Sequence, residues 1–233
     1  MTLLGAAWQT GHVIDERDAD ASRLAAEALA QDDPTGWFER LYAEAAAGDA
    51  IVPWDRDEPN PLLVDWTERR RLDGAGRRAM VVGCGLGRDA EHVAALGFHT
   101  TAFDISQTAV RGARERFPES TVDYVVADLL DPPTGWAGVF DLVVESITVQ
   151  SMPLSVRADA ITHIGQMVAR GGELVVISGI REEGEHVDGP PWPLTRAEVD
   201  SFAVGGLRAT HIEQVSRPDA PDAQRWRAAF RRA

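Results

Sequence analysis

The sequence has little of several residue types, and each shortage excludes a kind of protein. Cys84 is the single cysteine among 233 residues, so the chain can form neither an internal disulfide bond nor a metal site built from several cysteines. No apolar run approaches the roughly 20 residues that a transmembrane helix needs. The opening residues, MTLLGAAWQTG, also lack the charged and long apolar regions of a signal peptide. We therefore expect a cytoplasmic protein with no membrane span and no metal ion.

Lysine and arginine are scarce relative to the acidic residues. They number 23 against 37 Asp and Glu, which gives a formal net charge of -14. Proteins that bind nucleic acids present a basic face to the phosphate backbone, so this balance argues against a nucleic-acid partner. Arginines do cluster at residues 69–71, at residues 77–78 and near the C-terminus, but we interpret them as charges that face solvent. The length suits one α/β domain over residues 1–233 better than two domains.

One stretch in the first half of the chain has the pattern of a nucleotide-binding βαβ unit. Residues 79–82 are apolar and predict a short buried strand, which leads into the sequence Gly-Cys-Gly-Leu-Gly at residues 83–87. Residues 88–96 predict a helix, and residues 99–103 predict a second strand that ends on Asp104. Strand, glycine turn, helix, strand and terminal acid follow one another as they do in nucleotide-binding folds.

Each part of this pattern has a physical reason. Glycine lets the backbone turn sharply and approach a ligand without a clash of Cβ atoms. Free amides at the start of the next helix favour an anionic group, and an acid about 20 residues later can accept hydrogen bonds from ribose hydroxyls. The alternative is a glycine-rich turn with an incidental aspartate, and the correctly placed Asp104 favours the nucleotide. The dinucleotide pattern G-x-G-x-x-G needs glycine where this chain has Arg88, so a nicotinamide oxidoreductase is disfavoured.

The spacing G-x-G-x-G resembles the first motif of class I S-adenosylmethionine (SAM) methyltransferases. Flanking segments narrow the resemblance: Pro-Trp-Asp at residues 53–55, Pro-Asn-Pro at 59–61, Asp-Ile-Ser at 104–106 and Gly-Pro-Pro at 189–191. Together they resemble the thiopurine and thiol (halide) methyltransferases and their tellurite-resistance relatives. The chain departs from this group at Val82, where a proline is usual.

The resemblance implies a Rossmann-like α/β fold, with a seven-stranded, mostly parallel sheet, helices on both faces and an antiparallel last strand. Residues 1–60 are expected to form a helical cap over the site, and residues 61–233 the SAM-binding core. Apolar periodicity predicts helices at residues 20–30, 37–47, 62–71, 88–96, 107–117, 156–169 and 196–202. It predicts strands at residues 79–82, 99–103, 122–126, 140–144, 173–178, 207–215 and 225–230.

The same resemblance implies the cofactor SAM, with S-adenosylhomocysteine (SAH) as product, and a small-molecule acceptor. The glycine loop would hold the methionine end of SAM, Asp104 its ribose, and Asp128 with Leu129 its adenine. The cofactor-binding residues are expected to be Trp37, Trp54, Gly83, Cys84, Gly85, Asp104, Ile105, Asp128, Leu129 and Glu145. The acceptor is expected to contact Trp54, Thr148, Gln150, Met152 and Trp192.

Several side chains also have an ordinary structural interpretation. Helical spacing makes Phe38 and Tyr42 packing residues, whereas Trp37 and Trp54 stand near turns, where binding residues concentrate. An aromatic face can stabilise the sulfonium cation of SAM. We interpret Cys84 as a small residue that fills a tight turn, because no histidine and asparagine pattern of a thiol nucleophile accompanies it.

Methyl transfer from SAM is an in-line displacement at carbon, so alignment of the acceptor is the main task of the enzyme. A free thiol has a pKa of about 8.5 and is partly ionised near neutrality, whereas a hydroxyl acceptor more often needs a general base. A thiol acceptor could thus react without a strong general base, and the resemblance to the thiol methyltransferases implies S-methylation of a small thiol. The alternatives are O- or N-methylation of a small natural product, and a SAM-binding protein without turnover. No residue is named as the catalytic base; the possible ones are His12, His186, Asp55, Asp57 and Glu145.

Overall fold

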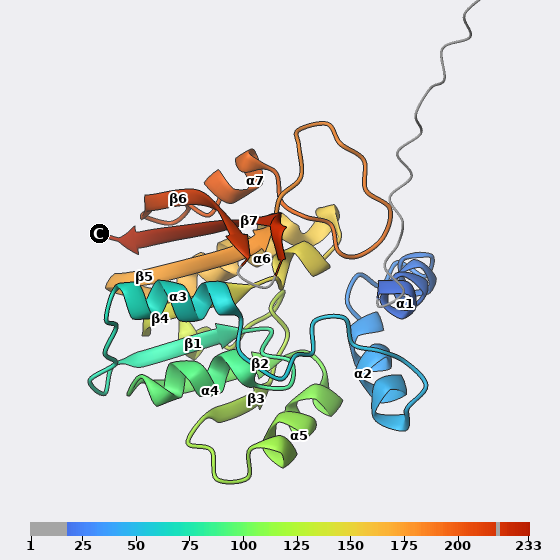
Figure 1. Ribbon diagram of the computed structural model, residues 1–233, viewed down its shortest axis with the longest axis horizontal. Coiled ribbons are helices and arrows are strands. Elements are labelled where there is room, and N and C mark those ends of the chain that lie inside the picture. Colours follow the sequence, from blue (N-terminus) through green and yellow to red (C-terminus); the bar gives the residue numbers. More distant parts are fainter. Residues whose placement is uncertain (1–17, 218–219) are drawn as a thin grey trace, which may run out of the picture.

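The computed structural model describes residues 18–217 and 220–233, so His12 lies outside the described residues. The described chain begins with two helices, α1 (Ala19–Leu29) and α2 (Trp37–Ala47), which pack on each other (Figure 1). A third helix, α3 (Pro61–Arg69), precedes the sheet. It begins after Asn60, whose side-chain oxygen accepts a hydrogen bond from the Leu62 amide and so caps the helix.

Seven strands form one sheet in the order β3-β2-β1-β4-β5-β7-β6. Neighbouring strands pair in parallel except at β7, which is antiparallel to both β5 and β6. This confirms the expected mostly parallel, Rossmann-like sheet with an antiparallel last strand. The strands are β1 (Arg78–Val82), β2 (His99–Asp104), β3 (Asp123–Val126), β4 (Phe140–Ser146), β5 (Val168–Gly179), β6 (Leu207–Arg217) and β7 (Ala220–Arg232).

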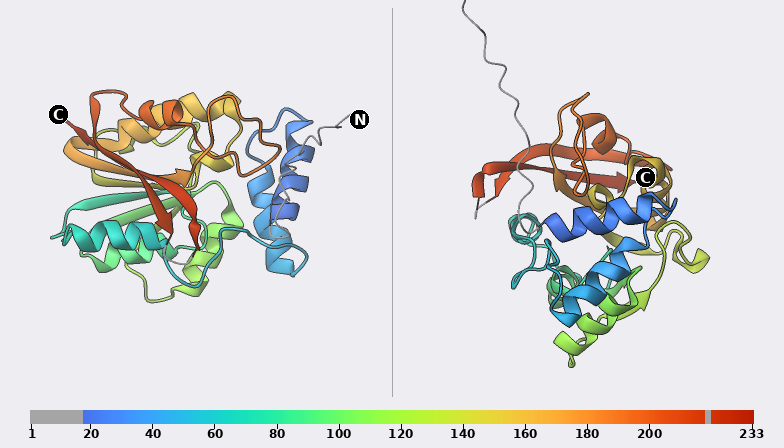
Figure 2. Two further views of the ribbon diagram at one scale, coloured as in Figure 1. Left: turned by 45° about the horizontal axis from the view of Figure 1, so that its top comes forward. Right: turned by 90° about the vertical axis from the view of Figure 1, so that its right-hand side faces the viewer.

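Helices cover both faces of the sheet (Figure 2). Alternate residues of β1 point to opposite faces: Ala79 and Val81 pack with α3, α4 and α5, whereas Met80 and Val82 pack with α6 and α7. Because the central strands are buried on both sides, they form the continuous apolar runs seen in the sequence. The covering helices are α4 (Arg88–Ala95), α5 (Gln107–Arg116), α6 (Leu154–Met167) and α7 (Arg196–Asp200).

Helices α1 and α2, which we call the helical pair, lie at the end of the sheet toward which β1 points (Figure 1). Glu39 of α2 fastens the pair to the start of α5. Its carboxylate accepts hydrogen bonds from the Ser106 hydroxyl (2.6 Å) and from the Thr108 amide and hydroxyl (3.0 and 2.7 Å), and a negative charge at a helix N-terminus is favourable. The pair thus stands by the carboxyl ends of the parallel strands, where open α/β sheets bind ligands.

The expected boundary between α6 and β5 is wrong. The helix ends at Met167 rather than at residue 169, and β5 begins at Val168 rather than at residue 173. Val168 is already extended (φ -70°, ψ 126°) and pairs with β4, after which the pairing register shifts. Gly171, at φ +73°, therefore lies in an irregularity of the strand and not at a helix end. Strands β6 and β7 are also longer than expected, because they pair with each other along most of their length.

Candidate functional site

The glycine loop, residues 83–87, joins β1 to α4 at the carboxyl end of the sheet. Gly83, Gly85 and Gly87 have left-handed backbone angles, with φ of +58°, +52° and +93°, which residues with a Cβ rarely adopt. Space is restricted as well, since a Cβ added to Gly85 would lie 2.7 Å from the Tyr42 hydroxyl. The alternating glycines thus follow from the shape of the loop and its close approach to α2.

A cavity opens between the glycine loop, the carboxyl ends of β1 to β4, helix α2 with the loop before it, and the segment after β4. The strand order β3-β2-β1-β4 places Asp128, Asp104, the glycine loop and Ser146 one after another along this edge. The structure therefore brings together ten of the residues that the sequence predicted as ligand-binding. These lining residues are Trp54, Gly83, Cys84, Gly85, Asp104, Ile105, Asp128, Leu129, Thr148 and Met152.

Asp104, the last residue of β2, is hydrogen-bonded to the glycine loop. Its Oδ2 accepts from the Gly85 amide and its Oδ1 from the Ser106 amide, both at 2.9 Å. The residue is 6% exposed, and burial raises its pKa to about 6 because desolvation disfavours the charged form. A carboxylate has about four acceptor positions, so Asp104 retains acceptor capacity on the cavity side.

Trp37 lies behind the cavity wall, contrary to its expected role. Its side chain is fully buried, stacks on Phe38 with 4.0 Å between ring centroids, and meets Trp54 edge-on at 6.1 Å. Phe38 and Tyr42, one helical turn apart, form the wall instead. The Tyr42 hydroxyl accepts a hydrogen bond from Trp54 Nε1 at 2.7 Å. The interpretation of Phe38 and Tyr42 as packing residues alone is therefore corrected, because α2 turns that face toward the cavity.

Glu145 also lies behind the wall, fully buried near the end of β4. Its Oε1 accepts a hydrogen bond from the Val149 amide at 2.9 Å, and the Thr148 amide bonds to the same carboxyl group. Burial raises its pKa to about 7. These bonds hold the turn at residues 147–152, where Ile147 has a φ of +60°, an unfavourable conformation for a β-branched residue. The geometry makes Glu145 a support of the cavity wall rather than a part of its surface.

Gln150 and Trp192 connect that turn to the segment at residues 181–194, outside the cavity lining. Gln150 Oε1 accepts a hydrogen bond from the Gly179 amide, and the Trp192 amide donates to the Gln150 carbonyl at 2.7 Å. The Trp192 ring packs against the helical pair. Both residues, expected to touch the acceptor, instead hold together the elements that surround the cavity.

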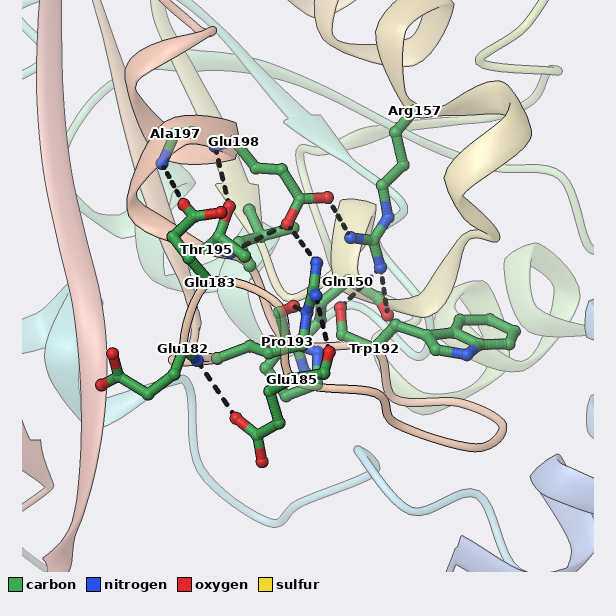
Figure 3. Close-up of polar contacts among 12 residues, drawn as sticks. Gln150, Arg157, Glu182, Glu183, Glu185, Trp192, Pro193, Thr195, Ala197 and Glu198 are labelled. Atoms are coloured by element: carbon green, nitrogen blue, oxygen red, sulfur yellow. Dashed lines mark hydrogen bonds and ion pairs between the residues drawn. The ribbon is translucent and has the colours of Figure 1, made fainter.

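Arg157, near the start of α6, fixes the same segment from inside the protein (Figure 3). Its buried guanidinium donates from Nε to the Met152 carbonyl (2.9 Å) and from Nη2 to the Trp192 carbonyl (2.5 Å). Nη1 pairs with Glu198 (2.5 Å), and Glu198 also pairs with Arg181 (2.8 Å). The rigid fork of one arginine therefore joins the turn after β4, the segment at residues 181–194 and α7.

The possible bases do not gather on the cavity surface. Asp55 lines it but forms a two-bond ion pair with Arg116 (2.8 and 3.0 Å), and His186 is exposed beside Asp188. Burial raises the pKa of the Cys84 thiol, in keeping with a turn-filling residue. In the part of the chain that the structure describes, no group of three or more His, Cys, Asp and Glu side chains could hold a metal ion. No described helix is long and apolar enough to cross a membrane.

Sequence reasoning missed a polar group at the β1/β4 side of the cavity. Asn60, Asp89 and Ser146 all line it. The Asn60 amide donates to Asp89 Oδ1 (2.7 Å), and Asn60 Nδ2 donates to Ser146 Oγ (3.0 Å). The sequence offered two signals, the Pro-Asn-Pro segment and the Asp89 that follows the glycine loop. An acid is common in the first turn of a helix, so Asp89 did not by itself point to the cavity. Nothing in the sequence pairs Asn60 with Ser146, 86 residues away.

Comparison with known proteins assigns a family to this geometry. Residues 79–172 match the family model of a methyltransferase domain. The chain is 26% identical to "probable thiol methyltransferase 2" of Arabidopsis thaliana over 176 residues, or 72% of this chain and 76% of that protein. An N-methyltransferase, NodS of Bradyrhizobium japonicum, crystallised with SAH, has the same fold with a TM-score of 0.61 and 22% identity over 83% of this chain and 98% of that one.

The chain is a SAM-dependent methyltransferase. The expected methyltransferase activity and the expected cofactor SAM are confirmed. A ubiquinone biosynthesis O-methyltransferase of Aromatoleum aromaticum is 35% identical over 119 residues, and the methyltransferase spans about half the length of that relative (50% of each chain). Since the two relatives are named for different acceptor atoms, the acceptor has to be argued from the site.

Proposed function

We propose that the methyltransferase transfers the methyl group of SAM to the sulfur atom of a small thiol. The observation that carries this proposal is the character of the wall formed by α2, the loop before it and the turn after β4. That wall consists of Thr35, Phe38, Tyr42, Ile147, Thr148, Ser151 and Met152. Its one titratable side chain, Tyr42, is buried and accepts a hydrogen bond from Trp54. Burial raises the pKa of the Tyr42 hydroxyl well above its ordinary value, so none of these side chains acts as a general base near neutrality. A thiol with a pKa of about 8.5 is already partly ionised near neutrality, so it can react there without one.

The cofactor, in this proposal, lies along the carboxyl ends of the strands. Asp128 and Leu129 hold its adenine, Asp104 its ribose, and the glycine loop its methionine end. The order of these residues along the sheet edge supports the placement. The aromatic wall of Phe38, Tyr42 and Trp54 then lies where it can stabilise the sulfonium charge.

The reaction needs little from the protein beyond alignment and exclusion of water. The thiol loses its proton to solvent, and the thiolate attacks the methyl carbon in line with the bond to the sulfonium sulfur. The new carbon–sulfur bond forms as the methyl–sulfonium bond breaks, and the electron pair of the broken bond returns to the cofactor sulfur to give SAH. An anion and a cation neutralise each other in this step, so a wall that excludes water and carries no charged side chain favours it.

An acceptor panel tests the proposal. The enzyme is incubated with methyl-labelled SAM and a set of small thiols, phenols and amines, and the products are identified by mass spectrometry. We expect labelled thioethers. The rate should rise with pH up to the pKa of each thiol, so that a more acidic thiol reaches its plateau at a lower pH. Labelled products from phenols or amines alone would contradict S-methylation.

O-methylation of a small phenol is the second candidate, favoured by the identity to the O-methyltransferase over half of the chain. O-methylation would differ from S-methylation in how the rate depends on pH. A phenol of pKa about 10 needs help to ionise, so the rise of rate with pH would follow a group of the enzyme and stay at the same pH for phenols of different acidity.

A further inference from the structure

One carboxylate at the β1/β4 side of the cavity, that of Asp89, accepts hydrogen bonds from neutral donors of the described chain. Asp89, in the first turn of α4, lines the cavity and is partly exposed to it. Its Oδ1 accepts a hydrogen bond from the Asn60 amide at 2.7 Å, and the Ser146 hydroxyl bonds to the same carboxylate. In the described part of the chain no basic side chain forms an ion pair with it; His92 and Arg56 act on it only by longer-range attraction.

The neutral donors leave some hydrogen-bond acceptor positions of this carboxylate unoccupied. It offers about four acceptor positions, of which two are occupied by Asn60 and Ser146. A negative charge removed from water is costly unless a positive partner is present. An acid at the start of a helix is often explained by the helix dipole. The dipole explains neither why Asp89 lines the cavity nor why Asn60 and Ser146 are hydrogen-bonded to it. A ligand cation with several N–H donors fits both.

We propose that Asp89 binds the α-ammonium group of the methionine part of the cofactor. This inference rests on the proposed placement of the adenine at Asp128 and the ribose at Asp104. A cofactor laid along the order β3-β2-β1-β4 ends with its amino-acid group beside Asp89 and Ser146. The carboxylate then accepts charge-assisted hydrogen bonds from the ammonium, and Asn60 is a positioning residue that holds both Asp89 and Ser146 in place.

Isothermal titration of the wild type and Asp89→Asn with two ligands tests this assignment. SAH carries the ammonium group, whereas 5′-methylthioadenosine keeps the adenine, ribose and thioether but lacks the amino-acid part. We expect Asp89→Asn to raise the Kd of SAH about 10- to 100-fold, the range of a lost hydrogen bond to a charged group, and to change the Kd of methylthioadenosine by less than about twofold. Asparagine keeps an oxygen for the Asn60 amide, and bound methylthioadenosine itself reports that the variant is folded.

A third ligand separates the ammonium from the neighbouring carboxylate. An SAH analogue that lacks only the amino group should bind the wild type and Asp89→Asn equally. An unchanged Kd of SAH, an equal loss for SAH and methylthioadenosine, or a persistent difference with the deaminated analogue would each overturn the assignment. Asp104→Asn is the matched control and should weaken both SAH and methylthioadenosine. If Asp104→Asn weakens neither, the proposed cofactor placement fails, and that result differs from every outcome at Asp89.

Discussion

At the scale of single residues, Asp104 should make cofactor binding depend on pH. Its raised pKa of about 6 means that the carboxylate, which accepts the ribose hydroxyls in the proposed site, is lost as the pH falls through about 6. We expect the affinity for methylthioadenosine to fall over that range. This ligand lacks the ammonium group, so the titration of Asp89 does not contribute. Titration calorimetry between pH 5 and 8 gives the measurement.

The asparagine variant supplies the comparison. Asp104→Asn cannot ionise, so its affinity for methylthioadenosine should be low and nearly constant from pH 5 to 8, about 10- to 100-fold below that of the wild type at pH 8. The amide can still accept one of the two bonds from Gly85 and Ser106. A wild-type affinity that does not change with pH would show that Asp104 is a structural anchor of the glycine loop and not a ribose partner.

At the scale of elements, Arg157 should control the acceptor and not the cofactor. Lysine keeps its charge but cannot reach the Met152 and Trp192 carbonyls and Glu198 at once. For Arg157→Lys we expect faster amide hydrogen exchange in residues 181–194 and a loss in kcat/KM for the acceptor of about tenfold or more, the effect of one lost charge-assisted contact. The Kd of SAH should not change.

The control for this variant is Arg196→Lys. Arg196 lies in the neighbouring α7, where it forms an exposed ion pair with Asp200, and such pairs contribute little. Hydrogen exchange followed by mass spectrometry, with SAH titration beside it, should separate the two variants. Equal losses of SAH affinity and acceptor turnover in Arg157→Lys would mean that the arginine stabilises the whole domain and does not position the acceptor segment.

Local sequence patterns predicted the elements but not which way their side chains face. The apolar runs placed nearly every strand and helix, because burial on one or both faces dictates those runs. On α2, however, the aromatic residues Trp37, Phe38 and Tyr42 do not show by themselves which side of the helix faces the cavity. That orientation is decided when the helix docks on the start of α5 through Glu39. Glu145 was expected at the ligand because it ends a central strand, yet the turn that follows it covers its carboxyl group.

At the scale of the whole molecule, prediction from the sequence is limited by how far apart along the chain the contacting residues lie. The glycine loop and Asp104 were predictable because their spacing is short and each residue type has a local reason. The joining of Asn60 to Ser146, and of Arg157 to Trp192, spans 86 and 35 residues. Such contacts exist only once the sheet order has formed, and no local propensity encodes them. The first contact lies beside the proposed ammonium site and the second behind the proposed acceptor side, so both of these parts of the cavity were less predictable than the glycine loop.

Two buried carboxyl groups, Asp104 and Glu145, make a distinct contribution to how the stability of the whole molecule varies with pH. The pKa of Asp104 is raised from 3.8 to about 6, and that of Glu145 from 4.5 to about 7. Between about pH 4 and 7 each of these two groups therefore holds more protons in the folded state than in the unfolded state, and its contribution to the free energy of unfolding falls as the pH rises. The lowered pKa values of Glu39, Asp65, Glu198 and Glu213 contribute in the opposite direction. Arg157 attracts the Glu145 charge and lowers that pKa, but burial has the larger effect.

Glu145→Gln should remove one of these two titrations. Glutamine keeps an oxygen that can accept the Val149 amide but never pays the cost of a buried charge. We expect the variant to exceed the wild type in free energy of unfolding by about 1 to 3 kcal/mol at pH 8, and by much less at pH 5. Urea unfolding at the two pH values measures both differences. If the two proteins lose stability in parallel as the pH rises, the Glu145 carboxyl group is ionised in the folded protein throughout, and some other group sets the pH dependence.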